Sequence, residues 1–163
     1  MTTPLYIFDL DGTIALINHR RPLLESKAQD RWQKFFAACI DDEPNGPVID
    51  TLMALRRSGA ECWIWSGRSD EVRSQTVEWL CKHSVFGNPT GALPAWPFMH
   101  PHRFRMRRAG DYMPDDELKL HWLTEMSQAD RSRLVAVFDD RDKVVAMWRA
   151  AGVPCFQVAP GAF

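Results

Sequence analysis

The sequence has only four cysteines in 163 residues, and no two of them form a Cys-x-x-Cys pair. Disulfide-rich secreted domains, zinc sites and redox motifs place their cysteines close together or at regular intervals. The scatter seen here is not that of a disulfide framework, and we expect reduced cysteines packed in the core of a cytosolic protein. The four are Cys39, Cys62, Cys81 and Cys155.

Long apolar runs are also missing from the sequence. No stretch approaches the roughly 20 apolar residues that a transmembrane helix needs. The first residues, Met1 to Pro4, lack the basic flank of a secretory signal peptide, and acidic residues follow soon after. We therefore expect a cytoplasmic protein that has no membrane partner.

Neither sign of charge dominates, since the formal net charge is -1 at pH 7. The general field of the protein therefore attracts neither nucleic acid nor an anionic membrane, and any such partner must be met by a local basic patch. With 45% hydrophobic and 25% charged residues, the composition is that of an ordinary globular protein. We expect one domain over residues 1–163, with a single core and no repeat or linker.

The stretch Tyr6–Thr13, Tyr-Ile-Phe-Asp-Leu-Asp-Gly-Thr, joins an apolar run to a pair of acids. Residues 4–8 predict a buried strand, with Asp9 and Asp11 at its carboxyl end. Two carboxylates this close repel each other unless a positive charge lies between them or one is protonated, so they indicate a metal site or an acid and nucleophile pair. The alternative is a strand-ending turn in which the acids and Gly12 serve only the backbone.

Apolar runs of strand length alternate with segments of helical periodicity along the whole chain. This alternation predicts an α/β protein with a doubly wound parallel sheet of about five strands and right-handed crossovers. Strands are expected at residues 4–8, 61–65, within 97–106, 134–138 and 154–158, and helices at 22–40, 48–57, 70–82, 114–126 and 143–151.

Other polar residues lie where predicted strands end or helices begin. A hydroxyl and a glycine ahead of a helix N-terminus form a favourable place to bind an anion, although a plain strand-to-helix turn is the alternative. An acid pair after the fourth strand repeats the pattern of the first. The residues are Ser66 and Gly67 after the second strand, Lys119 in the first turns of a helix, and Asp139 and Asp140 after the fourth strand.

Carboxylates from two parallel strands would make an all-oxygen site, which suits a hard cation such as Mg²⁺. A hydroxyl and an ammonium beside it could hold an anion against the metal, and that combination indicates phosphoryl transfer, with a carboxylate able to act as nucleophile. No Gly-x-x-x-x-Gly-Lys-Ser/Thr sequence is present, which argues against a nucleoside triphosphate kinase. The carboxylates are those of Asp9, Asp11 and either Asp139 or Asp140.

Arginines supply candidate contacts to a phosphorylated substrate. Arg20 and Arg21 lie on a short polar loop close to the first acid pair, and a solvated loop is the alternative. A later basic run interleaved with aromatics could bind a nucleic-acid strand, or it could be the charged edge strand of the sheet. His100 and His102 have no cysteine or third histidine nearby, so we expect a surface role for them. The basic run consists of Arg103, Arg105, Arg107 and Arg108.

These motifs, in this chain order, resemble the four signature motifs of the haloacid dehalogenase superfamily of phosphatases. The resemblance covers nearly the whole chain. Within the superfamily, the chain is similar to the 3'-phosphatase domain of bacteriophage polynucleotide kinase-phosphatase, although the kinase half has no counterpart here and segment 84–110 does not align. The matching residues are Asp9–Ala15, Asn18, Arg20, Ser66–Arg68, Lys119 and Asp139–Arg141, with Val144, Val145, Met147–Arg149, Gly152, Val153 and Gln157–Phe163.

The resemblance implies a Rossmann-like superfamily fold with a small or minimal cap, and it assigns a role to each motif residue. Asp9 would be the nucleophile and Asp11 the general acid and base. By the same resemblance, Mg²⁺ would be held by Asp9, the backbone carbonyl of Asp11, and Asp139 or Asp140. Ser66, Gly67 and Lys119 would bind the phosphoryl oxygens, and Arg20 and Arg68 would contact the substrate. Arg105 and Arg107 lie in the segment that does not align, and we expect them, from their place in the basic run, to contact backbone phosphates further along a nucleic-acid strand.

The expected function is therefore a magnesium-dependent phosphatase that removes 3'-phosphates from nucleotides or nucleic-acid ends through an aspartyl-phosphate. One alternative is a phosphatase for free nucleotides or small phosphorylated metabolites. Another is a receiver-like signalling module, which also combines acids, a hydroxyl and a lysine on a parallel sheet. A phage gene would place the protein in the cytoplasm of the host.

Overall fold

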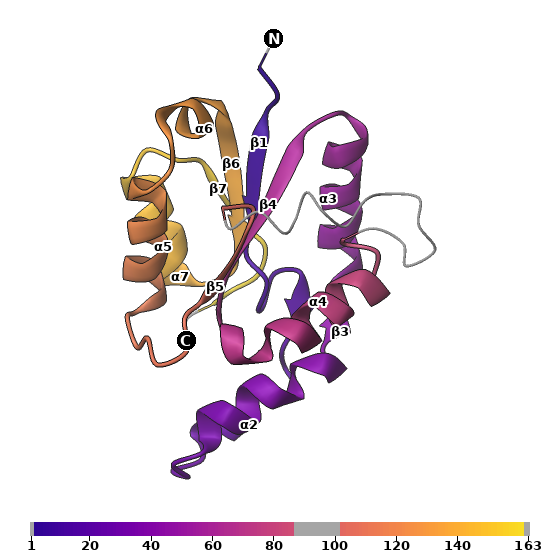
Figure 1. Ribbon diagram of the computed structural model, residues 1–163, viewed down its shortest axis with the longest axis vertical. Helices are drawn as coiled ribbons and strands as arrows, with labels where there is room; N and C mark the ends of the chain where they lie inside the picture. The colour runs from indigo at the N-terminus through magenta and orange to yellow at the C-terminus, as the bar shows by residue number, and fades with distance from the viewer. Residues whose placement is uncertain (1, 87–101, 162–163) are drawn as a thin grey trace.

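The computed structural model describes residues 2–86 and 102–161. At its centre is a five-stranded parallel sheet in the order β5-β4-β1-β6-β7, with helices on both faces (Figure 1). The predicted α/β architecture is confirmed, and part of the predicted strand within 97–106 lies outside the described residues, as does His100. The strands are β1 (Leu5–Phe8), β4 (Glu61–Ser69), β5 (Phe104–Arg107), β6 (Leu134–Asp139) and β7 (Cys155–Gln157).

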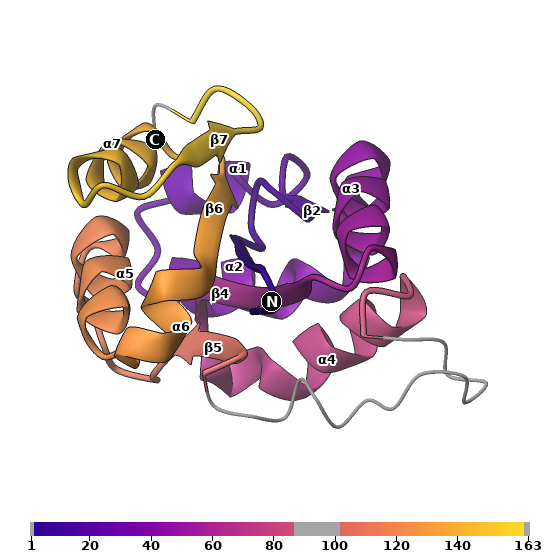
Figure 2. The same cartoon turned by 90° about the horizontal axis from the view of Figure 1, so that it is seen from above.

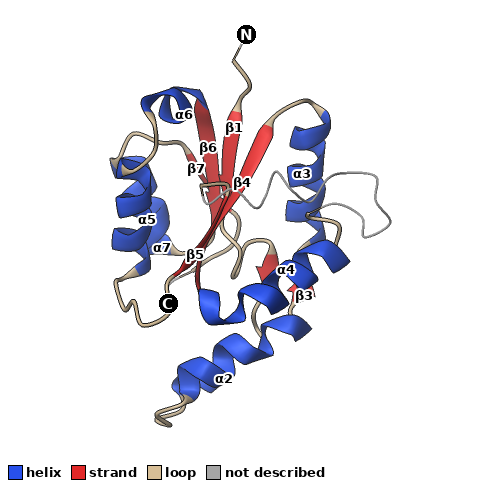
Figure 3. Cartoon of the chain, in the orientation of Figure 1, coloured by secondary structure: helices blue, strands red, loops and turns tan. Residues whose placement is uncertain are grey.

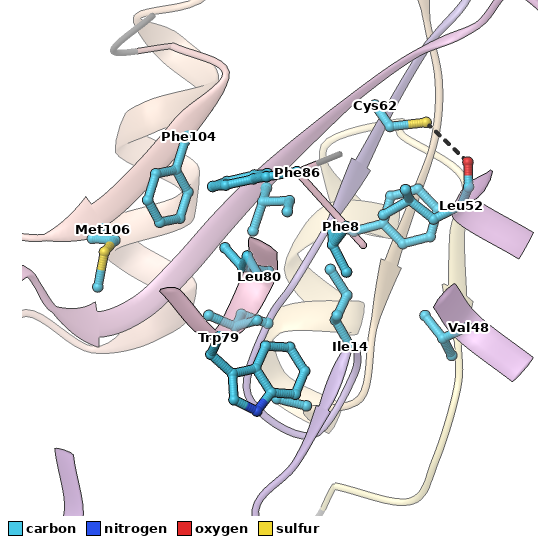
Figure 4. Close-up of a cluster of buried hydrophobic side chains, with 14 of the residues drawn as sticks. Phe8, Ile14, Val48, Leu52, Cys62, Trp79, Leu80, Phe86, Phe104 and Met106 are labelled. Atoms are coloured by element: carbon cyan, nitrogen blue, oxygen red, sulfur yellow. Dashed lines mark hydrogen bonds between the residues drawn. The ribbon is translucent and has the colours of Figure 1, made fainter. Parts of the chain in front are cut away.

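The strands alternate their side chains between two hydrophobic clusters, one on each face of the sheet. Phe8 and Ile64 pack into one cluster, while Ile7 and Trp65 pack into the other. Figure 2 shows the corresponding two helix layers, and Figure 4 shows the first cluster in detail. The first layer holds α3 (Gly46–Arg57) and α4 (Arg73–Lys82), and the second holds α5 (Asp115–Thr124) and α7 (Asp142–Ala150).

Residues 17–42 form an excursion that leaves the sheet and returns to the same place. Its base is closed by a two-stranded antiparallel sheet of β2 (Ala15–Leu16) and β3 (Glu43–Pro44). The side-chain amide of Asn45 also donates to the carbonyl of Thr13 at 2.8 Å. In Figure 3 the helix α2 (Arg31–Ala37) of this excursion lies beyond the carboxyl end of the main sheet. The small sheet was not predicted, because each strand has only two residues.

The prediction of one continuous helix over 22–40 is wrong. The segment forms α1 (Pro22–Glu25), α2 (Arg31–Ala37) and the 3₁₀ helix η1 (Ala38–Asp41). The backbone becomes extended at Ser26, whose hydroxyl accepts a hydrogen bond from the amide of Ala28 at 3.1 Å. Serine often bonds nearby backbone in this way, and the bond competes with helix formation.

The remaining helices agree with the sequence apart from two details. The predicted helix 70–82 begins as the 3₁₀ helix η2 (Asp70–Val72), where the hydroxyl of Ser69 accepts from the amide of Glu71 as an N-cap. A short helix, α6 (Gln128–Arg133), was not predicted. Within residues 2–86 and 102–161, no helix is both long enough and apolar enough to cross a membrane.

We predict that Leu52→Ala lowers the free energy of unfolding by about 2–5 kcal/mol, because Leu52 is fully buried between α3 and the sheet and its removal leaves a cavity. Leu120→Ala is the matched control, since Leu120 is 41% exposed on α5 and should lose less than about 1 kcal/mol. Urea denaturation followed by circular dichroism measures both. Equal losses in the two variants would contradict this description of the core.

Candidate active site

Three buried carboxylates meet at the carboxyl edge of the sheet. Asp9 directly follows β1, Asp139 ends β6, and Asp140 is the next residue. These strands are hydrogen-bonded neighbours, and the amide of Asp9 donates to the carbonyl of Phe138 at 2.9 Å. One oxygen from each carboxylate lies within 4.8 Å of the others. Asp9 therefore meets the acid pair at the end of β6, and the three carboxylates supply oxygen ligands to one point. The carboxylate of Asp11, which was expected in the same site, is not part of this group.

Lys119, from α5, bridges two of these carboxylates. Its Nζ lies 2.6 Å from Asp9 Oδ1 and 2.7 Å from Asp139 Oδ2, and the side chain is buried. Burial by itself lowers the pKa of Lys119, but the attraction of Asp139 and Asp9 outweighs it and raises that pKa above its ordinary value. The ammonium is therefore charged, and one positive charge faces three carboxylates.

The acid cluster carries more negative charge than its lysine can balance. Burial raises the pKa of Asp9 well above its ordinary value, against the opposing effect of Lys119 and with a further rise from Asp139 and Asp140. Burial and the neighbouring Asp139 raise the pKa of Asp140 to about 7. Protonation relieves such repulsion, and so does a bound cation. The arrangement is thus electrostatically suited to a divalent metal ion.

Glycine is required at position 12 for two reasons, the backbone conformation and the closeness of Asp140. Its φ of +87° lies in the left-handed region, which side chains with a Cβ rarely adopt. A Cβ at this position would also overlap the carboxylate of Asp140. The hydroxyl of Thr13 donates to Asp140 Oδ1 at 3.5 Å. The turn after β1 therefore brings the backbone close against the second acid pair.

Asp11 belongs to a separate cluster with two buried arginines. Arg20 Nη2 lies 2.7 Å from Asp11 Oδ1, and Arg68 Nε lies 3.1 Å from the same oxygen. Burial raises the pKa of Asp11, but the guanidiniums of Arg68 and Arg20 more than offset it and lower that pKa to about 2. The acids at positions 9 and 11 are thus neighbours in sequence with opposite electrostatic surroundings.

Asp42 completes this cluster and was missed from the sequence. Its carboxylate accepts from Arg20 Nε at 2.6 Å and from Arg68 Nη2 at 2.8 Å, and it is buried with them. The ring of His19 lies 2.9 Å from Asp42 Oδ1. The sequence shows only one acid among several in a turn, so no local signal distinguishes it.

The two arginines are 0% and 1% exposed, and neither is among the residues that line the cavity described below. The predicted contact of Arg20 and Arg68 with substrate stays a prediction. In this structure their guanidiniums are engaged by the carboxylates of Asp11 and Asp42.

The segment Ser66–Arg68 was expected to follow the second strand, but β4 continues to Ser69 and includes it. Its neighbour in space was not indicated by the sequence. Ser66 is fully buried, and its hydroxyl accepts from the amide of Arg68 at 3.1 Å. A Cβ on Gly67 would overlap the carboxylate of Asp115, the first residue of α5. Asp115 forms ion pairs with Arg107 and with Arg141 from the loop after β6. Acids in the first turn of a helix are common, so Asp115 resembled an ordinary capping residue.

The basic run 103–108 is divided by the structure. Arg105 pairs with Glu125, the residue that directly follows α5, and its guanidinium carbon lies 5.2 Å from the ring centroid of Trp65. Arg107 instead donates to the carbonyl of Gly67 at 2.9 Å and lines the cavity beside the acids. The substrate roles predicted for Arg105 and Arg107 stay predictions, but only Arg107 of the two lies at the cavity.

A cavity of about 790 Å³ opens at this edge of the sheet. Asp9 and Asp11 lie on it, as do residues from the carboxyl-terminal part of β4 and from the start of α5. The 17–42 excursion forms the facing wall. The lining includes Ile17, Arg21, Leu24, Trp32, Phe35 and Phe36 from the excursion, and Gly67, Ser69, Arg107, Arg108, Asp115, Arg141 and Lys143 from the body of the protein.

Known proteins match this chain in sequence and in fold. A family model described as the polynucleotide kinase PNKP phosphatase domain matches residues 3–163. Two chains from structures of the Pnkp1/Rnl/Hen1 complex, one described as an RNA repair complex, superpose with TM-scores of 0.75 and 0.72 at 29% and 30% identity, and each match covers 99% of this chain. This chain spans 44% and 48% of their lengths, which is less than half of either.

The fold is shared more widely than the sequence. CbbY from Rhodobacter sphaeroides, solved in complex with phosphate, superposes with a TM-score of 0.53 at 15% identity. The match covers 99% of this chain and 88% of that one. At this level of identity the likeness concerns the fold alone, and it agrees with the parallel sheet described above.

We predict that Asp42→Ala lowers the free energy of unfolding by about 3–5 kcal/mol, because it leaves two buried guanidiniums without one of their carboxylate partners. Asp41→Ala is the matched control, since Asp41 is exposed and its loss should change stability by no more than about 0.5 kcal/mol. Denaturant titration of both variants measures the difference. A loss at Asp42 no larger than that at Asp41 would show that the ion pairs do not stabilise the excursion.

Proposed function

Since the chain belongs to the family of polynucleotide kinase PNKP phosphatase domains, we propose that it is a magnesium-dependent phosphatase that removes 3'-phosphates from nucleotides or nucleic-acid ends. Membership of the haloacid dehalogenase superfamily, predicted from the signature motifs, is confirmed by the same family match. That match leaves only residues 1 and 2 of this chain uncovered, which supports a single phosphatase domain. The similarity to chains of an RNA repair complex supports a nucleic-acid end as the substrate.

The observation that carries the proposal is the cluster of Asp9, Asp139 and Asp140, with Lys119 between two of them, beside a cavity. Its all-oxygen ligand set and excess negative charge fit a magnesium ion. Asp9, Asp139 and the backbone carbonyl of Asp11 would hold the ion, with Asp140 as an alternative or neighbouring ligand. Magnesium bound there would supply positive charge to the phosphoryl oxygens.

Asp9 is the proposed nucleophile. One of its carboxylate oxygens forms a bond to phosphorus while the bond from phosphorus to the 3'-oxygen breaks, which gives an aspartyl-phosphate and a free 3'-hydroxyl. The ammonium of Lys119, 2.6 Å from Asp9 Oδ1, is close enough to balance charge on the transferring phosphoryl group. The hydroxyl of Ser66 and the backbone at Gly67 are the other proposed phosphoryl contacts.

Asp11 is the proposed general acid and base. In the first step it gives a proton to the departing 3'-oxygen, and in the second it takes a proton from the water that attacks the aspartyl-phosphate and releases inorganic phosphate. The two arginines hold Asp11 as a carboxylate, with a pKa of about 2. The resting form is therefore ready for the second step, and the proton used in the first step must be taken up when substrate binds.

Arg20 and Arg68 are proposed to act through Asp11. Their guanidiniums bind both Asp11 and Asp42, so the carboxylate of Asp11 is held in one position between the 17–42 excursion and the carboxyl-terminal part of β4. A fixed position matters because proton transfer requires hydrogen-bond distance in the transition state. In this proposal the arginines are positioning residues, and any contact that they make with substrate comes in addition.

The experiment that tests the function compares matched 3'- and 5'-phosphorylated oligonucleotides and mononucleotides by phosphate release. We expect release from the 3'-phosphates, loss of activity with a chelator, and recovery with magnesium. Equal rates on 5'-phosphates would show that the proposed polarity is wrong. Activity on mononucleotides or small phosphorylated metabolites alone would favour the alternative substrate class, and recovery only with zinc would contradict an all-oxygen metal site.

We predict that Asp9→Asn lowers kcat by at least about 10⁴-fold while the protein stays folded, because an amide of the same shape cannot attack phosphorus. Asp11→Asn should lower the rate by about 10²–10⁴-fold on a 3'-phosphorylated oligonucleotide but much less on an activated aryl phosphate, whose leaving group needs no proton. Steady-state kinetics on both substrates, with circular dichroism as the folding control, separates the two roles. Equal losses of Asp11→Asn on both substrates would remove the general acid assignment.

A further inference from the structure

The cavity has two walls of different chemistry. The body of the protein contributes all the acids and most of the cationic side chains, together with Tyr112 and Met113, whereas the 17–42 excursion contributes mainly apolar and aromatic side chains and no acid. Cavities of about 300–1,000 Å³ hold whole small-molecule ligands, so a volume of about 790 Å³ leaves room for much more than a phosphoryl group. The aromatic wall is therefore placed to contact the part of the substrate that carries the phosphate.

Trp32, on α2, is the prominent side chain of that wall. It is 48% exposed although it lines the cavity. Its ring centroid lies 5.9 Å from that of Phe35, in an edge-to-face arrangement, and 5.9 Å from that of Phe36. An exposed tryptophan is unremarkable on its own. One that is supported by two further rings and lines the cavity that also holds Asp9 offers a flat apolar surface to a ligand.

The aromatic wall is connected to the proposed acid and base by direct contacts. Phe35 is 4% exposed, and the guanidinium carbon of Arg20 lies 4.2 Å from its ring centroid. Arg20 in turn donates to Asp11 at 2.7 Å. Trp32 is thus two side-chain contacts away from the arginine that holds Asp11. The wall and the reacting end of the cavity therefore form one packed unit.

We propose that Trp32 stacks on the base of the nucleotide that carries the 3'-phosphate, and so selects substrates that have a base over those that have only a phosphate. This inference rests on the proposed function and deepens it. Every base has a flat π-face, so stacking on an aromatic side chain favours nucleotides with little preference among base sequences. The cationic lining from Arg107, Arg108 and Lys143 suits the phosphate backbone of the same strand.

The test uses two 3'-phosphorylated oligonucleotides that differ only in whether the terminal nucleotide carries a base or is abasic. Trp32→Ala should raise KM for the base-bearing oligonucleotide by about tenfold or more, with kcat and the abasic substrate changed less than about threefold. Trp32→Phe, which keeps a ring, should restore most of the loss. Phe156→Ala is the control, because Phe156 is an exposed aromatic on β7 that is not among the cavity-lining residues.

A second readout does not depend on turnover. In the Asp9→Asn background, fluorescence anisotropy with the labelled oligonucleotides should show that Trp32→Ala weakens binding of the base-bearing strand and leaves binding of the abasic strand unchanged. Equal effects on the two strands, or none on either, would overturn the stacking assignment while leaving the phosphatase proposal intact. A wild-type protein that releases phosphate from neither oligonucleotide would overturn the proposed function, and the stacking assignment with it.

Discussion

Repulsion among three buried carboxylates is the constraint on which the rest of the site depends. Asp9, Asp139 and Asp140 come from adjacent parallel strands, so the hydrogen bonds of the sheet hold them together at a cost in electrostatic energy. Lys119 offsets part of that cost through its contacts with two of them. Gly12 makes room for the third, since any side chain there would overlap Asp140. The remaining excess of negative charge is what makes the edge suitable for a divalent cation.

In the second charge cluster the carboxylates and the arginines balance each other. Asp11 and Asp42 face two guanidiniums, and Asp11 is held ionised, whereas the pKa of Asp9 is raised by burial and by its acidic neighbours. Two carboxylates two residues apart therefore have different proton affinities, which is the condition for giving them different chemical roles. The 17–42 excursion makes this possible, because it carries Arg20 and Asp42 back over the end of β1.

Most of the fold followed from local patterns. The strands and four of the five predicted helices begin close to their expected positions, since alternating apolar runs and helical periodicity are properties of short segments. The end of β4 was misjudged, because the strand continues to Ser69 and was expected to end at Trp65. The prediction of a continuous helix over 22–40 was wrong because the apolar periodicity continues past Ser26, whereas the backbone becomes extended at that residue and the helix ends. The short strands β2 and β3 were not predicted, because a segment of two residues is too short to show an alternation of apolar and polar side chains.

The sequence by itself determined which strand ends carry acids, where a hydroxyl and a glycine precede a helix, and that a lysine lies one turn into α5. Only the tertiary structure decided how these groups are partnered. Asp42 accepts a hydrogen bond from Arg68, which lies 26 positions further along the chain. Arg107 forms an ion pair with Asp115, which belongs to a different element, and Arg105 forms one with Glu125, away from the cavity. Strand and helix patterns arise within a few residues, whereas the choice of a charge partner depends on how distant segments fold back on one another.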